Sequence, residues 1–308
     1  NPESCARRFI GWFASRALRR RWSADEDGPL LAVYRAGAVD GRGYEAGIRH
    51  VIEAVLASPA FVYRAEVGTP AGNGRFQLTA YEVAAQIAAF LLDGPPDEAL
   101  WMAAASDRLS SEAGVQEEVG RLLALPDVQA HLVAALLRWV SASQVGGVVK
   151  DPKVYPDFDA ALARSLLLES TTFLENVLWR EDGSLKELLT SRRTWIDQRL
   201  ANHYGVPFPG KDGSRFVPIT LPPEKRAGIL THGSVLATHS AIDDTSIVQR
   251  GLFVGAALLC MDGVPEPPAE LADTINQVTA TLKTERARFE HRMETSPCSG
   301  CHRTFDPY

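Results

Sequence analysis

The sequence has no long hydrophobic run, no excess of positive charge, and few cysteines and methionines. No apolar stretch among its 308 residues reaches the roughly 18 residues that a membrane-spanning helix needs, so we expect no transmembrane segment. The net charge of -6 argues against a surface that binds nucleic acid. With 45% hydrophobic and 23% charged residues, the chain should fold into an ordinary globular body.

Two of the four cysteines form a motif close to the C-terminal end. Cys298 and Cys301 are separated by two residues, and His302 follows at once. This C-x-x-C-H spacing is typical of covalent attachment of a c-type haem. Each thiol can add to a vinyl group at the porphyrin edge, and the adjacent imidazole can ligate the iron. The sequence therefore predicts a haem c cofactor, with Cys298 and Cys301 as thioether anchors and His302 as the proximal ligand.

Three other interpretations of the two thiols stay open. A redox disulfide of the thioredoxin type normally opens a helix after a strand in a βαβ unit, and no such unit is expected nearby. A zinc site needs four ligands, often from a second cysteine pair, whereas the other cysteines are single and distant. The spacing can also arise by chance. Haem attachment is the leading interpretation.

The place of the motif limits the origin of a second axial ligand, because only six residues follow His302. Methionine is scarce, with three residues in the chain. We favour His291 as the distal ligand, since it lies on the helix that leads into the motif. His239 is the second candidate, because it follows small residues that a flat macrocycle can approach. An open iron face is the alternative and would permit small-ligand or peroxide chemistry.

The remaining chemistry concerns two arginines and two cysteines. A guanidinium can grip a carboxylate through two hydrogen bonds, so Arg250 and Arg292 are candidate partners of a haem propionate. For each of them an ordinary surface charge is the alternative. Haem c is attached outside the cytoplasm, where disulfides also persist. Cys5 and Cys260 therefore either form a disulfide or remain two buried free thiols.

Hydrophobic periodicity predicts a mostly α-helical fold. Capping boxes mark two helix starts, at Ser23 with Glu26 and at Thr79 with Glu82. We expect helices over residues 6–18, 23–34, 44–57, 79–91, 97–105, 113–125, 127–141, 159–179, 224–239, 246–260 and 283–292.

The helices should form a multi-helix array of three packed modules: residues 1–67, 75–210 and 211–308, the last of which carries the haem. Breaker residues over Gly68–Gly74 indicate a linker, and Phe216–Thr220 is the one expected strand. Glu169 and Glu175 on the longest helix invite an acid–base interpretation. We expect them instead to be solvated charges on the helix surface.

Short sequence motifs along nearly the whole chain resemble those of a known protein family. They are Ala17–Trp22, Gly43–Ile48, Leu56–Arg64, Leu78–Glu82, Phe90–Asp97, Leu200–Gly205, Arg226–Thr231, Thr245–Ser246, Arg250–Gly251 and Glu290–Pro307. Their order resembles a family of large exported multi-domain proteins of planctomycetes and myxobacteria that contain planctomycete-type cytochrome c domains. Ile247 and Phe305 depart from the family, which usually has proline and methionine at these positions.

The resemblance implies export, one haem near the end of this set of modules, a mostly helical body, and no known reaction. His291 and the attachment triplet fall on family motif positions. His239, Cys5 and Cys260 match the myxobacterial members, and this favours a Cys5–Cys260 disulfide. The family continues beyond the position of Tyr308, and the chain starts at Asn1 rather than methionine. We therefore expect a processed or longer protein.

The sequence as a whole predicts a periplasmic or otherwise exported c-type cytochrome with one haem. Its expected role is electron transfer, as a subunit or module of a larger assembly. The expected partner is a redox protein or a larger respiratory or surface complex, with no nucleic acid involved. A haem-dependent oxidase or peroxidase with an open distal iron face is the alternative, so enzymatic activity is left open.

Overall fold

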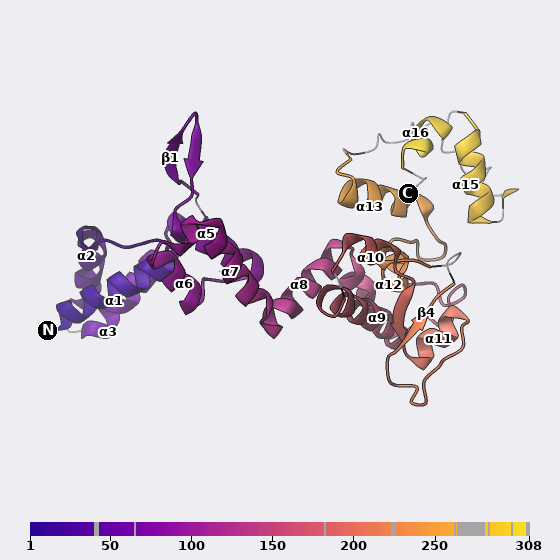
Figure 1. The fold of residues 1–308 in the computed structure, drawn as a ribbon, viewed down its shortest axis with the longest axis horizontal. Coiled ribbons are helices and arrows are strands. Elements are labelled where there is room, and N and C mark those ends of the chain that lie inside the picture. Colours follow the sequence, from indigo (N-terminus) through magenta and orange to yellow (C-terminus); the bar gives the residue numbers. More distant parts are fainter. Residues whose placement is uncertain are drawn as a thin grey trace. The chain divides into compact units, whose positions relative to one another are not determined.

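The structure is a computed structural model, and it describes residues 1–39, 43–64, 66–181, 183–222, 226–261, 263, 281–282, 284–296 and 298–305. This described part is mostly α-helical, as predicted, with two short antiparallel sheets (Figure 1). The chain divides into two compact units, residues 1–132 and 133–308.

The first unit contains helices, 3₁₀ helices (η) and one β-hairpin. In chain order they are α1 (Pro2–Ala17), η1 (Ala24–Glu26), α2 (Asp27–Ala38), α3 (Gly43–Leu56), α4 (Pro59–Val62), β1 (Thr69–Gly72), β2 (Arg75–Gln77), α5 (Ala80–Leu91), α6 (Glu98–Ala105), η2 (Arg108–Ser110) and α7 (Glu112–Leu123). The next helix, α8 (Pro126–Trp139), continues into the second unit.

Helices α1 to α3 pack around a small core that includes Ile10, Leu31 and Val51, none of them more than 3% exposed. Each helix therefore buries one apolar stripe, as its periodicity predicts. The close approach of α2 and α3 depends on Gly47, because a Cβ atom there would lie 2.6 Å from the ring of Tyr34. Glycine is thus the one residue that fits this crossing.

Local sequence patterns predicted two helix starts correctly but did not predict one β-hairpin. Both predicted capping boxes are present, at the starts of η1 and α5. The segment expected as a linker instead contains the β1–β2 hairpin. Asn73 and Gly74 join its strands, and both have positive φ, as the tight turns of hairpins require.

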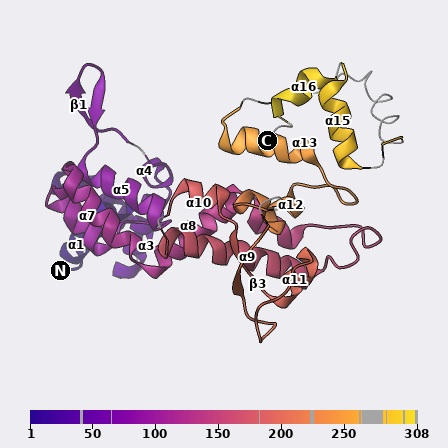
Figure 2. The ribbon, with the colours of Figure 1, turned by 45° about the vertical axis from the view of Figure 1, so that its right-hand side comes forward.

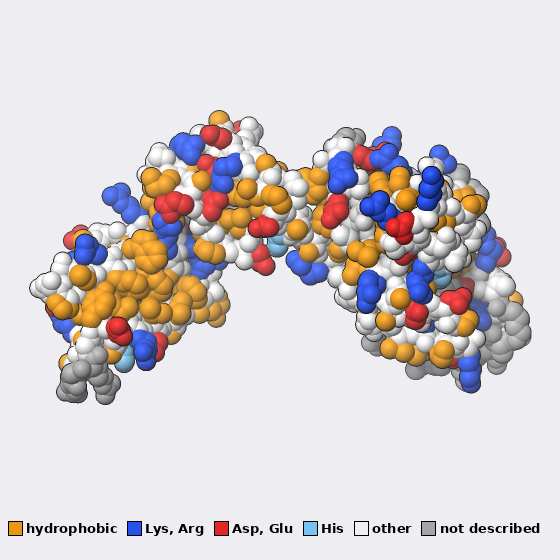
Figure 3. Space-filling model, turned by 90° about the horizontal axis from the view of Figure 1, so that it is seen from below, with side chains coloured by type: hydrophobic (Ala, Val, Ile, Leu, Met, Phe, Trp, Pro, Cys, Tyr) orange, Lys and Arg blue, Asp and Glu red, His pale blue; other side chains and the backbone are white. Residues whose placement is uncertain are grey.

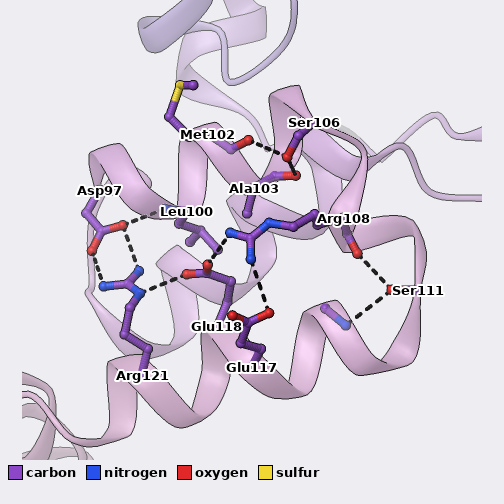
Figure 4. A network of polar contacts seen from close by, with 11 residues as sticks. Asp97, Leu100, Met102, Ala103, Ser106, Arg108, Ser111, Glu117, Glu118 and Arg121 are labelled. Carbon is purple, nitrogen blue, oxygen red and sulfur yellow. Dashed lines mark hydrogen bonds and ion pairs between the residues drawn. The ribbon is translucent and has the colours of Figure 1, made fainter.

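An ion-pair network ties η2, α6 and α7 together (Figure 4). The Glu118 carboxylate, whose side chain is 4% exposed, accepts hydrogen bonds from Arg108 at 2.9 Å and from Arg121 at 2.8 Å. Arg121 also donates to both carboxylate oxygens of Asp97 at 2.9 Å. Asp97 in turn caps α6 by accepting from the Leu100 N–H at 2.8 Å. A buried charge is therefore paired on two sides, as its burial requires.

Hydrophobic side chains gather on the face of the first unit that Figure 3 shows. The exposed large apolar residues of this unit include Trp12, Val62, Tyr63, Phe76 and Phe90, with Trp12 60% exposed. Contiguous apolar surface of this kind is typical of sites that contact other molecules.

The second unit is built around one long central helix. After α8 its elements are η3 (Ala142–Gly147), α9 (Ala160–Trp179), α10 (Leu185–Thr190), β3 (Arg193–Ile196), α11 (Gln198–Tyr204), β4 (Val217–Thr220), η4 (Ile229–Thr231), α12 (Gly233–Thr238), α13 (Ile247–Leu258), α15 (Glu285–Glu294) and α16 (Cys298–Phe305).

Helix α9 lies among α8, α10, α11 and β3 (Figure 2). Asp159 starts it by accepting from the Leu162 N–H at 2.7 Å. Phe173 belongs to one core cluster of the unit, and Leu166 belongs to another. Because α9 buries residues toward both clusters, it is the helix on which the rest of this unit packs.

The expected strand is confirmed, although its partner was not predicted. β4 pairs antiparallel with β3, with Arg193 opposite Thr220 and Ile196 opposite Val217. The helix expected over residues 224–239 is instead η4 followed by α12; residues 223–225 lie outside the described part. Gly228 precedes η4 with a φ of 68°, and a Cβ there would lie 2.1 Å from the Leu189 carbonyl oxygen. This turn therefore requires glycine.

The last expected helix is present as α15, with Lys283 outside the described residues. Most of the proline-rich stretch after residue 263 also lies outside them. Within the part of the chain that the structure describes, no single helix has the length and apolar composition to cross a membrane. Taken together across their bend, α7 and α8 do meet these two criteria.

Candidate functional site

The attachment motif opens a short helix. Helix α16 begins at Cys298, the first residue of the motif. Positions three and four residues apart lie on the same face of an α-helix, so the positions of Cys298, Cys301 and His302 share one face of α16. Cys298 carries a free, half-buried thiol, and His302 is also half-buried. The backbone thus places the three motif positions side by side, and their roles as thioether anchors and iron ligand stay predictions.

Two neighbouring helices contact α16. It packs against α15 and against α13, and both ribbon views show α13 beside it (Figures 1 and 2). The Arg303 Nε donates to the Met293 carbonyl at 3.1 Å, and the Ser299 N–H donates to the Thr295 carbonyl at 2.9 Å. These bonds fold α16 back against the end of α15.

His291 lies near the C-terminal end of α15, the helix that packs on α16. Its side chain is half-buried, and its Nδ1 lies 3.4 Å from Thr295 Oγ1, which is a long hydrogen bond. Met293 is two residues further along and so lies on a different side of α15. The structure brings His291 to the neighbour of the attachment helix, and its role as distal ligand stays a prediction.

His239 lies at the C-terminal end of α12, where the ring of Phe253 on α13 stacks on it with centroids 4.1 Å apart. The ring makes a hydrogen bond with the backbone of Val140, while its Nε2 is buried with no partner among the described residues. Burial, and then the charge of Arg250, lowers the pKa of His239. The imidazole is therefore fixed in place with one ring nitrogen unsatisfied. Its role as an iron ligand also stays a prediction.

The two arginines proposed for a propionate differ in their surroundings. Arg250 on α13 donates from Nη2 to Thr245 Oγ1 at 2.5 Å, while its Nε is buried without a partner in the described part of the chain. Burial lowers the pKa of Arg250. Arg292 on α15 instead forms an ion pair with Glu285 at 2.5 Å. Arg250 is thus the better suited of the two to receive a carboxylate.

Cys5 and Cys260, the pair expected to form a disulfide, are free thiols in this structure. Both thiols are free and exposed, rather than buried as the alternative had it. Cys5 is on α1 of the first unit, where Arg8 Nη2 lies 3.5 Å from its Sγ, whereas Cys260 follows α13 in the second unit. The two cysteines belong to different units, and the disulfide between them stays a prediction.

A buried polar cluster inside the second unit was missed. Glu169 on α9 is 0% exposed, which contradicts the expectation of a solvated charge; Glu175 is exposed, as expected. The Glu169 carboxylate accepts from Thr194 Oγ1 at 2.9 Å and from the Tyr204 hydroxyl. Burial raises the pKa of Glu169 to about 7, against the lowering effect of these two hydrogen bonds. The guanidinium of Arg226 lies 4.0 Å from the centre of the Tyr204 ring.

The next residue of α9 continues this cluster toward α12. The Ser170 hydroxyl lies 3.1 Å from His232 Nδ1 and 2.6 Å from the Ser234 hydroxyl. His232 packs edge-on against the Phe173 ring, with centroids 4.7 Å apart. Burial, and then the charge of Arg226, lowers the pKa of His232 to about 3, so the ring is neutral. The burial of Glu169 and of His232 depends on partners that are distant in the sequence. Local sequence patterns do not reveal such partners.

Three segments of the chain match family models, each described as a protein of unknown function: residues 5–66 (DUF1595), 78–206 (DUF1592) and 226–308 (DUF1588). These are planctomycete-type cytochrome c domain families, and three such matches in one chain are consistent with a multi-domain protein of unknown function. No curated protein matches the chain, and no solved structure matches it. Among the described residues, no group of three or more His, Cys, Asp or Glu side chains is placed to hold a metal ion.

Proposed function

We propose that the chain is an exported c-type cytochrome with one covalently bound haem, which transfers electrons as a module of a larger assembly. The observation that carries this proposal is α16, whose first turns place Cys298, Cys301 and His302 at positions on one helix face. The kinship of its segments with cytochrome-type domain families supports it.

The described residues fit a haem in three respects. Cys298 has a free thiol that is partly accessible, as thioether formation requires. Helices α13 and α15 both pack beside α16 and so supply walls near the attachment face. Arg250, on one of those helices, has a buried Nε without a partner and can donate to a propionate oxygen. A bound haem would supply reversible one-electron chemistry at the iron.

Each residue then has a defined task in the proposal. Cys298 and Cys301 hold the cofactor, and His302 is the proximal ligand. His291 is the preferred distal ligand, because α15 packs directly against α16. His239 is the second candidate, since its buried Nε2 has an unused lone pair while the other ring nitrogen is fixed by the backbone of Val140. The partner is a redox protein or a larger respiratory or surface complex, and the location is the periplasm or another site outside the cytoplasm.

Optical spectra of the purified full chain test this function, recorded oxidised and reduced, with and without cyanide. We expect a c-type α band on reduction and slow, weak cyanide binding, because two protein ligands leave no open position. Rapid, tight cyanide binding would instead favour an oxidase or peroxidase with an open face. Absence of a Soret band would overturn the proposal.

Three histidine variants assign the distal ligand: His291→Ala, His239→Ala and, as a matched control, His131→Ala on α8. The variant that removes the distal ligand should become high-spin and bind cyanide rapidly, and we expect this of His291→Ala. His131→Ala should retain the spectrum of the parent chain. If neither His291→Ala nor His239→Ala changes the spin state, neither residue is the ligand.

A further inference from the structure

We propose that Arg250, His239 and Lys150 form a binding site for a small oxyanion, a carboxylate or a phosphate group. The three residues come from α13, from the end of α12 and from the chain after η3. The inference rests on these residues alone and does not depend on the attachment of a haem.

Direct contacts bring the three side chains around the segment that links α12 to α13. Lys150 Nζ donates to the Ser240 hydroxyl and the Ala241 carbonyl at 2.6 Å and to the Ser240 carbonyl at 3.2 Å, immediately after His239. These bonds use its three N–H groups, so Lys150 brings its positive charge to the site. Arg250 holds the other end of the segment through Thr245. Phe253, nearly one turn after Arg250 on α13, stacks on the His239 ring. Contacts of Lys150, Arg250 and the stacked His239 ring therefore hold the segment between α12 and α13 in place.

Two atoms in this place lack a partner. Arg250 Nε is a buried donor, and His239 Nε2 is a buried ring nitrogen; neither has a hydrogen-bond partner among the described residues. A buried polar group without a partner typically costs about 1–3 kcal/mol. The Arg250 Nε–H is a donor that calls for an acceptor atom from a ligand, while the neutral His239 ring lines the same place. An oxyanion offers several acceptor oxygens to fill this role.

The two cations of the cluster also have no direct ion-pair partner among the described residues. Within the part of the chain that the structure describes, no carboxylate lies at ion-pair distance from Lys150 or Arg250. The acidic groups nearby are engaged elsewhere: Asp244 pairs with Arg288 at 2.5 Å, and Glu285 pairs with Arg292 at 2.5 Å. Two partly buried cations without a counter-ion are unfavourable, and a bound anion would relieve this cost.

The titration behaviour of these groups agrees with the contacts. Burial, and then the charge of Arg250, lowers the pKa of Lys150. The same two causes, in the same order, lower the pKa of His239. The side chains of Arg250, His239 and Lys150 are half-buried as a whole, while Arg250 Nε and His239 Nε2 themselves are buried.

The oxyanion has two possible sources, a haem propionate or a free carboxylate or phosphate. Calorimetric titration separates them. The first arm uses the full-length Cys298→Ser/Cys301→Ser chain, which carries no haem, with acetate and inorganic phosphate as probes at constant ionic strength. We expect saturable binding that weakens at least tenfold in Arg250→Gln. The matched control Arg164→Gln, on the exposed side of α9, should bind like the parent chain.

The second arm repeats the titration on the haem-loaded chain. Loss of binding there assigns the site to a propionate, whereas retained binding assigns it to a free oxyanion; both outcomes uphold the site. Arg250→Lys keeps the charge but loses the Nε–H, so its affinity should lie between those of the parent and Arg250→Gln. Thermal melts confirm that each variant folds. Absence of saturable binding in the haem-free chain, or equal affinity of parent and Arg250→Gln, would overturn the proposal.

Discussion

Two polar clusters in the second unit differ in how their groups are satisfied. Around Glu169 each carboxylate oxygen has a hydroxyl donor, from Thr194 or Tyr204, and the residue is 0% exposed. Around Arg250 the opposite holds, because a buried Nε–H has no acceptor among the described residues. The first cluster needs nothing beyond the chain itself, whereas the second is incomplete without another molecule.

This difference separates a structural role from a binding role. A buried group whose partners all come from the chain contributes to folding, because its removal leaves those partners unsatisfied. A partly exposed group without partners contributes little to folding and gains its partners from a ligand. The Glu169 cluster joins α9, β3 and α11, while the Arg250 cluster lies beside the helix that packs on the attachment motif.

The largest expected effect comes from removing Glu169. Glu169→Ala leaves the Tyr204 and Thr194 hydroxyls without their acceptor and opens a cavity in the core, so it should lower the free energy of unfolding by about 3 kcal/mol or more. Glu175→Ala, on the exposed side of the same helix, should change it by less than about 0.5 kcal/mol. Urea titrations followed by circular dichroism measure both. Equal effects of the two substitutions would remove the structural role assigned to the cluster.

A smaller expected effect is the pH dependence of stability, to which Glu169 and His232 contribute in opposite directions. The folded pKa of Glu169 is raised to about 7, so its contribution to the free energy of unfolding is present at low pH and is lost as pH rises through about 7. The folded pKa of His232 is lowered to about 3, so its contribution is present above the unfolded value and is lost as pH falls toward about 3. In mildly acidic solution, rising pH therefore lowers the free energy of unfolding through Glu169 and raises it through His232.

Single variants separate these two slopes. Glu169→Gln mimics the protonated carboxyl and should lose the Glu169 contribution to stability, which falls as pH rises from the unfolded pKa of about 4.5 to the folded pKa of about 7. His232→Asn should lose part of the decline on the acidic side. Denaturant unfolding at a series of pH values gives the difference between parent and variant. Parallel curves for parent and Glu169→Gln would show that Glu169 does not titrate in this range.

The smallest expected effect is at Arg250. Arg250→Met in the haem-free chain, without added oxyanion, should change the free energy of unfolding by less than about 1 kcal/mol or raise it, because a partly buried charge without a counter-ion is removed. The same urea titration measures this change. A loss above about 2 kcal/mol would mean that Arg250 is satisfied by the chain, which would erase the contrast between the two clusters.

Local signals predicted much of the helical fold. The capping boxes at Ser23 and Thr79 are present because each depends on residues only three positions apart. The β1–β2 hairpin was missed although Asn73-Gly74 is a strong turn signal, since the surrounding breaker residues suggested a linker. Strand β3 was missed because its pairing with β4 joins residues more than 20 positions apart.

The candidate site was predicted in part. The motif residues follow from the spacing of Cys298, Cys301 and His302, whereas helix α16 was not predicted, since the last expected helix ended at Arg292. The burial of Glu169 could not be predicted, because its partners Thr194 and Tyr204 come 25 and 35 residues later. The unpartnered nitrogens of His239 and Arg250 are likewise visible only once α12 and α13 are placed against each other.

The central claim is that α16 carries a covalent haem. Intact-mass spectrometry of the full chain, produced with export to the periplasm and with the machinery for haem attachment, tests it most directly. We predict a mass increase of one haem that survives denaturation and disappears in Cys298→Ala/Cys301→Ala, while Cys5→Ala/Cys260→Ala retains it. A parent chain with the mass of the unmodified polypeptide would contradict the account.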